Sequence, residues 1–432
     1  MAKQPPPPGL PLRIKAAEKL RDVLGGAHFS PLTSDDLPDG RDRAIANRLV
    51  TTALRRHGQI DVILAELLDR GLPRKSGSFE AVMRLSLAQL VWLPDLGAHS
   101  ALFLAVEALK RDTKAAHLTG LANAVLRRAQ AESLRYLDLP DHLLIPDALK
   151  PGWSALYGEE AIDRFAAALI AGASLDLTLR DEDPELVAAL GGVPVMADTV
   201  RIETRDRPVE AMPGYAEGRF WVQDAAAAIP ARLIDLPQGA RVLDLCAAPG
   251  GKTAQLAKAG YRVTALDSDA TRLMRLKDNI DRLGYTAEIV TADAANYAPR
   301  EKFDAALLDA PCSATGTFRR HPEVLWRRTR EDIMGRAALQ RRLIANAAAS
   351  LNPGGILVYC VCSLEPEEGE AQLPWVLAHQ TGLEPFKIDP AELNDLEGAV
   401  TTDGCVRTHP GLVTKDGGAL DGFFVARFRR RA

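Results

Sequence analysis

The second half of the chain alternates short apolar segments with segments of helical length, and this alternation restricts the folds it can adopt. The apolar segments are, in chain order, RVLDL from residue 241, YRVTALD from 261, AEIVTAD from 287, DAALLDAP from 304 and GILVYCVC from 355. Apolar strands that alternate with helices predict a parallel sheet covered by helices on both faces. We therefore expect an α/β fold of the Rossmann-like type.

Acidic residues stand where these predicted strands end. Parallel sheets bind their ligands at the carboxyl ends of the strands, so residues there are candidates for a site. The four aspartates in question are Asp244, Asp267, Asp293 and Asp309. One such aspartate could simply cap a helix, but four in corresponding places predict a common binding site.

The chain of 432 residues is long enough for two or three domains. Its first part has the apolar spacing of helices, for example in IDVILAELL from residue 60 and LTGLANAVL from 118. Prolines then punctuate the chain near residue 140. We expect the divisions that follow: a mobile proline-rich tail over 1–12, an all-helical bundle over 13–138, a linker with a small subdomain over 139–218, and the α/β domain over 219–432.

Composition excludes several classes of protein. Apolar residues make up 47% and charged residues 25%, as in ordinary globular chains. The sequence shows no run of about 20 apolar residues and no signal peptide at its start, so we expect a cytoplasmic protein without a membrane partner. Five cysteines are an odd number for a disulfide framework. Cys-x-Cys without a second ligand pair does not supply a zinc site, and we expect no metal.

The segment DLCAAPGGKT, from Asp244, ends like a nucleotide-binding P-loop. A P-loop needs an earlier glycine five residues before Gly251, and Cys246 stands there. A triphosphate would also be repelled by the neighbouring aspartates unless a metal intervened, whereas a sulfonium with an amino group would not. Glycines let the backbone approach a ligand closely. We therefore expect a turn for S-adenosylmethionine, formed by Cys246, Ala247, Ala248, Pro249, Gly250, Gly251 and Lys252.

Two cysteines follow neighbouring strands of the predicted sheet, Cys312 in DAPC and Cys362 in YCVCS. The C5 carbon of a pyrimidine is a poor nucleophile until a thiolate adds to C6 and makes the ring an enamine. The C5 proton must then leave and the enzyme must be released, which gives a second thiol a role. Buried cysteines are more often small hydrophobes, and we expect that for Cys246, Cys360 and Cys405.

Several ordered motifs then point to a family. LDLCAAPGGKT, DAPCSATGT, HPEVLW, YCVCS with LEPEE after it, and DGFFVARF resemble the RNA cytosine-C5 methyltransferases of the Nop/Sun type, over about residues 215 to 428. In addition, SALFLAVEALKR and LTGLANAVLRR resemble the NusB-like RNA-binding domain that precedes the catalytic domain in bacterial small-subunit ribosomal RNA methyltransferases of the B type. The match is weakest over about 150 to 215, where LTLR stands in place of a form closer to LRVN.

The resemblance implies roles for individual residues. Asp267 would hold the cofactor ribose, Asp293 would lie near the adenine, and Asp309 near the methyl group and the target base. Cys362 would be the nucleophile and Cys312 would help to release the product. One departure is Val361, where the family usually has threonine before its nucleophile. The lost hydroxyl puts a local hydrogen bond in doubt.

RNA contacts are expected after the fourth strand, where arginines alternate with aromatic residues. Guanidinium groups bind phosphates and aromatic faces stack on bases. The candidates are Arg319, Arg320, His321 and Trp326, and in the bundle Arg127 and Arg128. A base must leave its stack before C6 can be attacked, which predicts a single-stranded loop or an opened junction as target. The sequence leaves three alternatives open: a transfer RNA enzyme of the same type, a nucleotide hydrolase, or an RNA-binding factor without activity.

Overall fold

The computed structural model describes residues 6–202, 207–393 and 396–432, and its contacts divide the chain into two compact units. The helical unit comprises Met1–Pro151, Phe165–Ala171 and His321–Arg327. The α/β unit comprises Gly152–Arg164, Gly172–Arg320 and Arg328–Ala432. No helix within these described ranges is long and apolar enough to span a bilayer.

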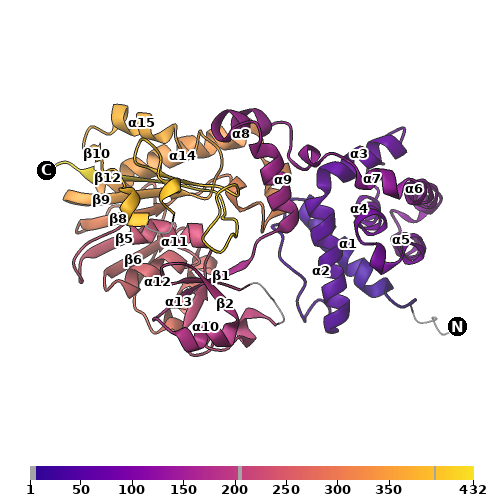
Figure 1. Cartoon of the computed structure of the whole chain (residues 1–432), viewed down its shortest axis with the longest axis horizontal. Coiled ribbons are helices and arrows are strands. Elements are labelled where there is room, and N and C mark those ends of the chain that lie inside the picture. The colour runs from indigo at the N-terminus through magenta and orange to yellow at the C-terminus, as the bar shows by residue number, and fades with distance from the viewer. Residues whose placement is uncertain (1–5, 203–206, 394–395) are drawn as a thin grey trace. The chain divides into compact units, whose positions relative to one another are not determined.

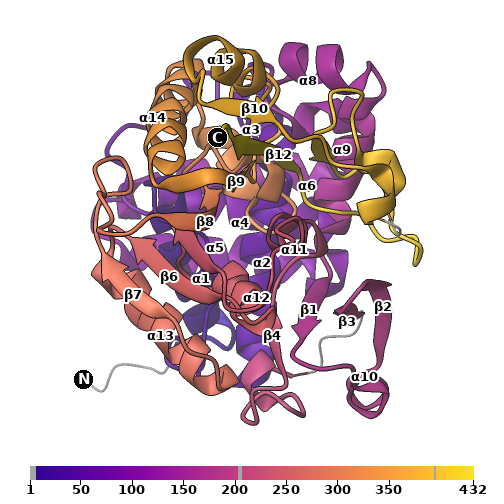
Figure 2. The same cartoon turned by 90° about the vertical axis from the view of Figure 1, so that its left-hand side faces the viewer.

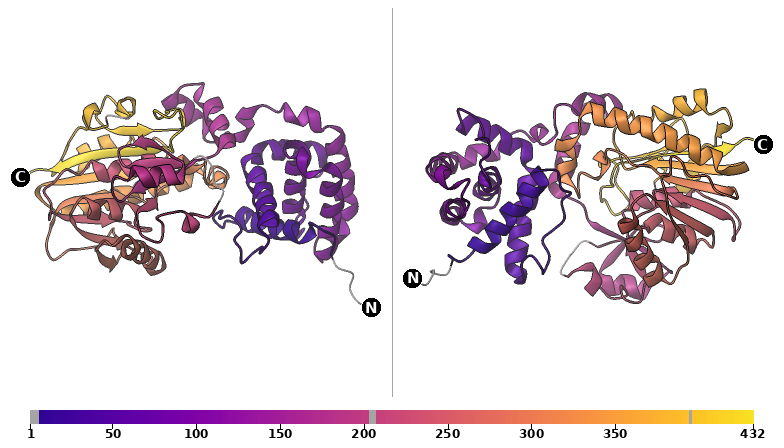
Figure 3. Two further views of the ribbon diagram at one scale, coloured as in Figure 1. Left: turned by 60° about the horizontal axis from the view of Figure 1, so that its bottom comes forward. Right: turned by 180° about the vertical axis from the view of Figure 1, so that it is seen from behind.

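The helical unit is a bundle built around one central helix (Figures 1 and 3). Its helices are α1 (Leu10–Leu24), α2 (Gly40–Arg55), α3 (His57–Leu67), α4 (Phe79–Trp92), α5 (Ala98–Arg111), α6 (Thr119–Ala131) and α7 (Ser133–Leu137). Helix α4 is buried on nearly every side, as expected for a helix that is apolar all round. Its buried Arg84 forms ion pairs with Asp61 and Glu80, and this pairing makes burial of the charge tolerable.

The helical periodicity read from the sequence matches α3 and α6. In α3 the four residues Ile60, Ile63, Leu64 and Leu67 are buried. In α6 the buried face is formed by Ala122, Val125, Leu126 and Ala129, while Leu121 is exposed. Of the proline-rich tail, residues 1–5 lie outside the described residues. Helix α1 already begins at Leu10, inside the predicted tail, because a proline such as Pro11 is compatible with the first turn of a helix.

The segment His321–Arg327 belongs to the helical unit although it follows the fourth central strand in sequence. Trp326 stacks on His57, with ring centroids 4.6 Å apart. A Cβ atom at Gly58 would lie 2.6 Å from the Trp326 ring, so this approach requires glycine. Arg327 donates to the carbonyl groups of Val23, Gly26 and Ala27, at and just after the end of α1.

The α/β unit contains an eight-stranded sheet in the order β10-β12-β9-β8-β5-β6-β7, with β11 paired to β12 (Figure 2). Its strands are β5 (Arg241–Leu245), β6 (Arg262–Asp267), β7 (Glu288–Thr291), β8 (Phe303–Asp309), β9 (Leu351–Val361), β10 (Leu383–Pro385), β11 (Val406–Thr408) and β12 (Phe423–Arg430). Strands β5 to β9 are parallel, as the sequence predicts. Strand β12 pairs antiparallel with β9 on one side and with β10 on the other.

Helices cover both faces of this sheet. They are α11 (Ala225–Arg232), α12 (Gly251–Lys258), α13 (Ala270–Leu283), α14 (Arg330–Ala349) and α15 (Gln372–His379). Successive side chains of a strand point to opposite faces, so Val242 packs with α11 and α12 while Leu243 packs with α14 and α15. Helix α13 packs on the same face as α12. Burial on both faces explains why the strands read as continuous apolar runs.

The described part of the region that resembled the family least forms three α-helices and, with β4, a second, four-stranded sheet. The elements are α8 (Lys150–Tyr157), α9 (Ala161–Ala171), β1 (Leu175–Leu179), α10 (Pro184–Leu190), β2 (Gly192–Met196), β3 (Thr199–Ile202) and β4 (Phe220–Val222). The sheet is antiparallel, in the order β2-β3-β1-β4. Strand β3 lies within the sequence DTVRIET, for which a strand is expected from the sequence and of which residues 203–204 lie outside the described residues. Helices α8 and α9 are separated by Gly158, which has a φ of 87°.

Candidate active site

The predicted cofactor turn joins the end of β5 to the start of α12. Gly250 precedes α12 with a φ of 104°, a conformation that favours glycine. A Cβ atom at Gly250 would also lie 2.9 Å from Leu276 Cγ, so a side chain does not fit there. Cys246 adopts a φ of 61°, which few residues other than glycine adopt. The turn therefore presents backbone, with few side chains in the way, before the first turn of a helix.

Two of the predicted aspartates fix this turn. Asp244 is fully buried in β5, and Thr253 Oγ1 donates to its Oδ2 at 2.6 Å. Asp267, at the end of β6, accepts from Ala248 N at 3.3 Å and from Asp269 N at 3.0 Å. These bonds tie the ends of β5 and β6 to the turn.

The other two predicted aspartates differ from each other. Asp293 is exposed and accepts from Ala295 N and from Asn296 Nδ2, so it caps its own turn after β7. Asp309, at the end of β8, accepts from Lys252 Nζ at 2.8 Å. Burial disfavours the charge of this lysine, but Asp309 outweighs burial and raises the pKa of Lys252. Lys252 therefore stays protonated at neutral pH.

The electrostatics of this corner suit a cationic ligand. Burial, and to a smaller degree Asp309 and Asp267, raises the pKa of Asp244 to about 7. Burial followed by the same carboxylates raises the pKa of Cys246 to about 12. Burial is the larger cause of both shifts, and the neighbouring carboxylates add to each. The positive sulfonium and ammonium groups of S-adenosylmethionine would offset this negative charge, whereas a triphosphate would increase it. The residues present therefore fit the cofactor that the sequence predicts.

Cys312 and Cys362 lie side by side, as the sequence predicts from two neighbouring strand ends. Their Sγ atoms are 3.4 Å apart although fifty residues separate them in the chain. Cys312 is buried, whereas Cys362 is partly exposed. The hydrogen bond to Cys362, followed by burial, raises the pKa of Cys312 well above its ordinary value. The arrangement thus favours a protonated Cys312 that donates to the sulfur of Cys362.

The remaining cysteines are buried or partly buried. Cys360 is paired with Asp309 across β8 and β9, and its Sγ lies 3.5 Å from Asp309 Oδ1. Burial raises the pKa of Cys360 well above the ordinary value, and Asp309 adds to this. Burial also raises the pKa of Cys405 to about 12. Val361 is fully buried in the apolar layer between the sheet and α14, which accounts for an apolar side chain at this position.

The RNA contacts predicted for Arg319 and Arg320 need correction. Arg319 is 3% exposed and donates to Asp421 and to the Gly172 and Ala419 carbonyl groups. Arg320 is bound by two buried carboxylates, those of Asp421 and Asp224. These acids lie about a hundred residues away in sequence, so the sequence pattern gave no sign of them. Both arginines stabilise the α/β unit.

We expect Arg320→Met to lower the free energy of unfolding by about 3 kcal/mol, because it leaves two buried carboxylates without their shared cation. Burial and Asp224 already raise the pKa of Asp421. Urea unfolding curves measure the loss. Arg342→Met, at an exposed position on α14, is the control and should change stability by less than about 0.5 kcal/mol. Unchanged stability together with weaker RNA binding would restore the RNA assignment.

Trp326 and His321 belong to the helical unit, and the packing of Trp326 on His57 and Gly58 explains the tryptophan without RNA.

Two residues near the thiols were not singled out from the sequence. Arg328 Nε donates to the carbonyl oxygen of Ser313 at 2.7 Å, beside Cys312. Glu368 is fully buried and contacts the residues that follow both cysteines. The acidic LEPEE motif was the only sequence signal for Glu368.

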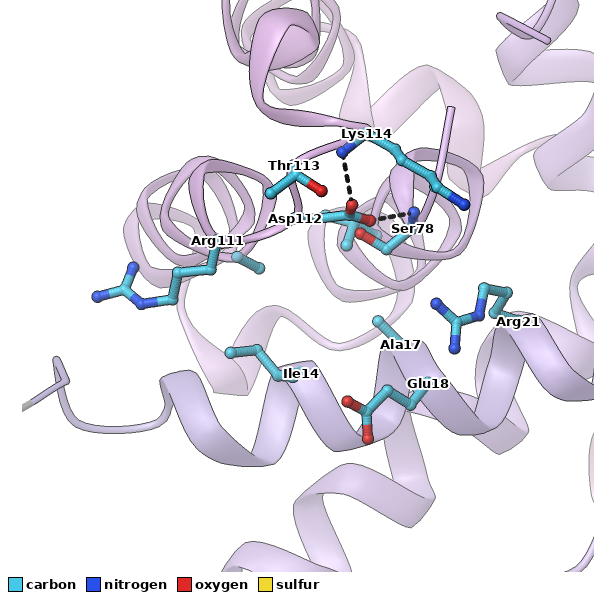
Figure 4. A pocket seen from close by; sticks show the side chains of 12 residues that line it. Ile14, Ala17, Glu18, Arg21, Ser78, Arg111, Asp112, Thr113 and Lys114 are labelled. Carbon is cyan, nitrogen blue, oxygen red and sulfur yellow. Dashed lines mark hydrogen bonds between the residues drawn. The ribbon is translucent and has the colours of Figure 1, made fainter. Parts of the chain in front are cut away.

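A hollow of about 640 Å³ lies on the helical unit, and none of the predicted site residues lines it (Figure 4). Asp112 accepts from the backbone of Ser78 and of Lys114 there, so it links the end of α5 to the start of α4. The hollow is lined by the cations Arg21, Arg111 and Lys114 and by the acids Glu18 and Asp112. The charges nearly balance, and Arg111 is paired with Glu107. The hollow therefore shows no preference for an anion.

Comparison with known proteins identifies both units. Residues 231–429 match the family model described as 16S rRNA methyltransferase RsmB/F, and residues 15–131 match the NusB family. A ribosomal RNA small subunit methyltransferase B of Xanthomonas campestris pv. campestris is 39% identical over 393 residues, which cover 86% of this chain and 89% of that protein. The protein of the same name from Klebsiella pneumoniae subsp. pneumoniae is 36% identical, covering 97% and 98%.

Solved structures support the same fold. The crystal structure of PH0851 superimposes with a TM-score of 0.78 at 23% identity and covers 99% of both chains. A methyltransferase homologue from Pyrococcus horikoshii superimposes with a TM-score of 0.53 at 28% identity and covers 65% of this chain and 93% of its own. The Rossmann-like sheet and the NusB-like bundle predicted from the sequence are thus confirmed. The chain belongs to the 16S rRNA methyltransferase RsmB/F family and is an RNA methyltransferase that uses S-adenosylmethionine.

Proposed function

We propose that this protein forms 5-methylcytosine in bacterial small-subunit ribosomal RNA, with Cys362 as the nucleophile and Cys312 as its partner. The observation that supports this proposal is the 3.4 Å approach of the two thiols at the ends of β8 and β9. Covalent C5 methylation needs both an attacking group and a group that assists release. The names of the relatives supply the ribosomal substrate.

Cys362 is the better nucleophile of the two because it is partly exposed and because Cys312 can donate a hydrogen bond to its sulfur. The thiolate of Cys362 adds to cytosine C6, and the electron pair of the C5–C6 double bond moves to make C5 nucleophilic. S-adenosylmethionine, when bound, supplies the methyl group that C5 accepts. Transfer of the C5 proton to water then restores the double bond and expels Cys362 as thiolate. Cys312 lies where it can assist this last step.

Lys252 and Asp309 complete the charges around the thiols. The ammonium group of Lys252 interacts electrostatically with both Cys360 and Cys362. Asp309 holds the lysine in place through the 2.8 Å contact. We propose that Cys246 to Lys252 hold the amino-acid part of the cofactor and that Asp267 holds its ribose. Asp293 would approach the adenine only after breaking its hydrogen bonds with Ala295 N and Asn296 Nδ2.

The target is an unpaired cytosine, in free RNA or in a partly assembled small subunit, because a stacked base hides C6. We propose that Arg328 and Arg336 bind its phosphates. Burial followed by the charge of Arg336 lowers the pKa of Arg328, so a phosphate between the two guanidinium groups would remove an unfavourable repulsion. Such a substrate places the protein in the cytoplasm.

The test is methyl transfer from labelled S-adenosylmethionine to three RNAs: protein-free small-subunit ribosomal RNA, partly assembled small subunits, and transfer RNA. Bisulfite sequencing then locates the modified cytosine. We expect one cytosine of small-subunit RNA to be methylated and no incorporation into transfer RNA. Methylation of transfer RNA alone would favour the second candidate, and RNA binding without methylation would leave only a binding factor.

We also expect cofactor binding to release a proton near neutral pH. The pKa of Asp244 is about 7 because of burial and neighbouring carboxylates. A cation bound nearby favours the ionised carboxylate, so affinity should rise as pH increases through 7 and proton release should fade above about pH 8. Calorimetry at pH 7 in buffers of different ionisation enthalpy measures this release. Asp244→Asn should abolish it, and equal binding enthalpies in all buffers would contradict the assignment.

A further inference from the structure

The residues that follow the two cysteines are joined beneath the site. Ser313 comes directly after Cys312, and Ser363 directly after Cys362. Both serines are fully buried, and their Oγ atoms are 3.0 Å apart. Both hydroxyl groups donate to the same carboxylate oxygen, Glu368 Oε2, at 2.5 Å each. The two cysteine-bearing loops are therefore held through one side chain.

The second oxygen of this carboxylate is also used. Glu368 Oε1 accepts from Ser313 N at 2.9 Å and from Gln340 Nε2, on α14, at 3.0 Å. Glu368 itself is fully buried. A carboxylate offers about four acceptor positions, and the two hydroxyl groups, one backbone N–H and one amide fill them. Hydrogen bonds to an ionised acceptor are roughly twice as strong as neutral ones, so the link between the loops is rigid.

We propose that Glu368 is a positioning residue that fixes the separation of the Cys312 and Cys362 sulfur atoms. This inference rests on the proposed roles of the two thiols. Glu368 does not touch the reacting atoms. It acts one residue away from each thiol, through Ser313 and Ser363, and it ties both loops to α14 through Gln340.

Besides holding the two loops in place, Glu368 affects the pKa of Cys312 through its charge. Cys312 has a raised pKa because of the hydrogen bond to Cys362, burial, the charge of Cys362 and, in addition, the charge of Glu368. Removal of that charge should make Cys312 ionise at lower pH. A merely structural residue would not produce such a shift, which gives the inference a specific signature.

Glu368→Gln is the informative substitution because it keeps the size and removes the charge. An amide NH2 group in place of either oxygen would face the N–H of Ser313, since Ser313 N lies within 3.2 Å of both. Two donors then oppose each other, and the loops must shift. Glu367→Gln is the matched control, because Glu367 is adjacent and partly exposed, and its carboxylate forms a long ion pair with Arg330 at 3.9 Å.

We expect Glu368→Gln to lower kcat by roughly 10- to 100-fold, the cost of a small misplacement of reacting groups, with KM for RNA and the Kd of S-adenosylmethionine within about two-fold. Glu367→Gln should keep the original kcat. Iodoacetamide labelling followed by peptide mass spectrometry should show alkylation of Cys312 beginning at lower pH in Glu368→Gln than in the unsubstituted protein and Glu367→Gln.

Unchanged kcat and an unchanged Cys312 labelling profile in Glu368→Gln overturn the inference. If that variant does not fold, Ser313→Ala and Ser363→Ala decide: melting temperatures close to the original with lower kcat support it, and original kcat in both contradicts it. The labelling profile needs no RNA and no turnover. A protein that methylates none of the three RNAs would therefore refute the proposed function while the role of Glu368 is still decided.

Discussion

Cys362→Ala should abolish methyl transfer, with a loss of at least about 10,000-fold in the single-turnover rate, as is typical when a covalent nucleophile is removed. Without the thiolate, cytosine C5 stays unreactive. The cofactor is expected to bind with unchanged affinity, because the turn from Cys246 to Lys252 belongs to β5 and α12 rather than to β9. Transfer of labelled methyl groups measures the first quantity and calorimetry the second.

Cys405→Ala is the matched control for this experiment, since Cys405 is a buried thiol that lies outside the proposed site. It should retain the original rate. A Cys362→Ala protein that still modifies cytosine normally would refute the mechanism. A stable RNA adduct formed through Cys312 in that variant would instead reverse the roles of the two thiols.

Cys312→Ala should have a different outcome: the protein attacks RNA and then stays attached to it. Addition of Cys362 to C6 does not need a second thiol, but release needs a group close to the adduct, and Cys312 Sγ is 3.4 Å from the nucleophilic sulfur. We expect a complex of protein and RNA that survives denaturing electrophoresis, with multiple turnover lowered at least about 100-fold. Mass spectrometry of the digested complex should find the nucleotide on Cys362.

The control for trapping is the double variant Cys312→Ala with Cys362→Ala, which should form no adduct because the attacking sulfur is gone. Rapid turnover by the Cys312→Ala protein, without a trapped complex, would show that another group releases the product. Asp309 would then be the next candidate for the releasing group, since it ends β8, three residues before Cys312.

The central sheet could be predicted because its strands are apolar on both faces and each is followed by a helix, a local pattern. The pairing of β12 with β9 was missing from the predicted sheet. Phe424 and Val361 meet across that pair although they are far apart in the chain, and periodicity carries no information about such partners. Residues 150–215 could not be assigned because their elements are short and are interrupted by turns, as at Gly158.

The candidate site shows the same division between local and distant information. Asp267 and Asp309 could be placed because the end of a parallel strand is a definite position in the fold. Arg319 and Arg320 looked like RNA contacts because their partner, Asp421, comes from a distant loop. Glu368 was missed for a similar reason: its importance depends on Ser313, which only the fold brings to it.

The sulfur atoms of Cys312, Cys360 and Cys362 lie near the ends of β8 and β9. Even so, no second thiol is placed to replace the proposed nucleophile, Cys362. Cys360 stands two residues before Cys362, but it lies inside the strand, fully buried and turned toward Asp309. We expect an incoming base to reach only Cys362, which is partly exposed and directly follows the end of β9. Duplication of a thiol in sequence therefore gives no redundancy in the proposed chemistry, and we expect a single substitution at residue 362 to abolish activity.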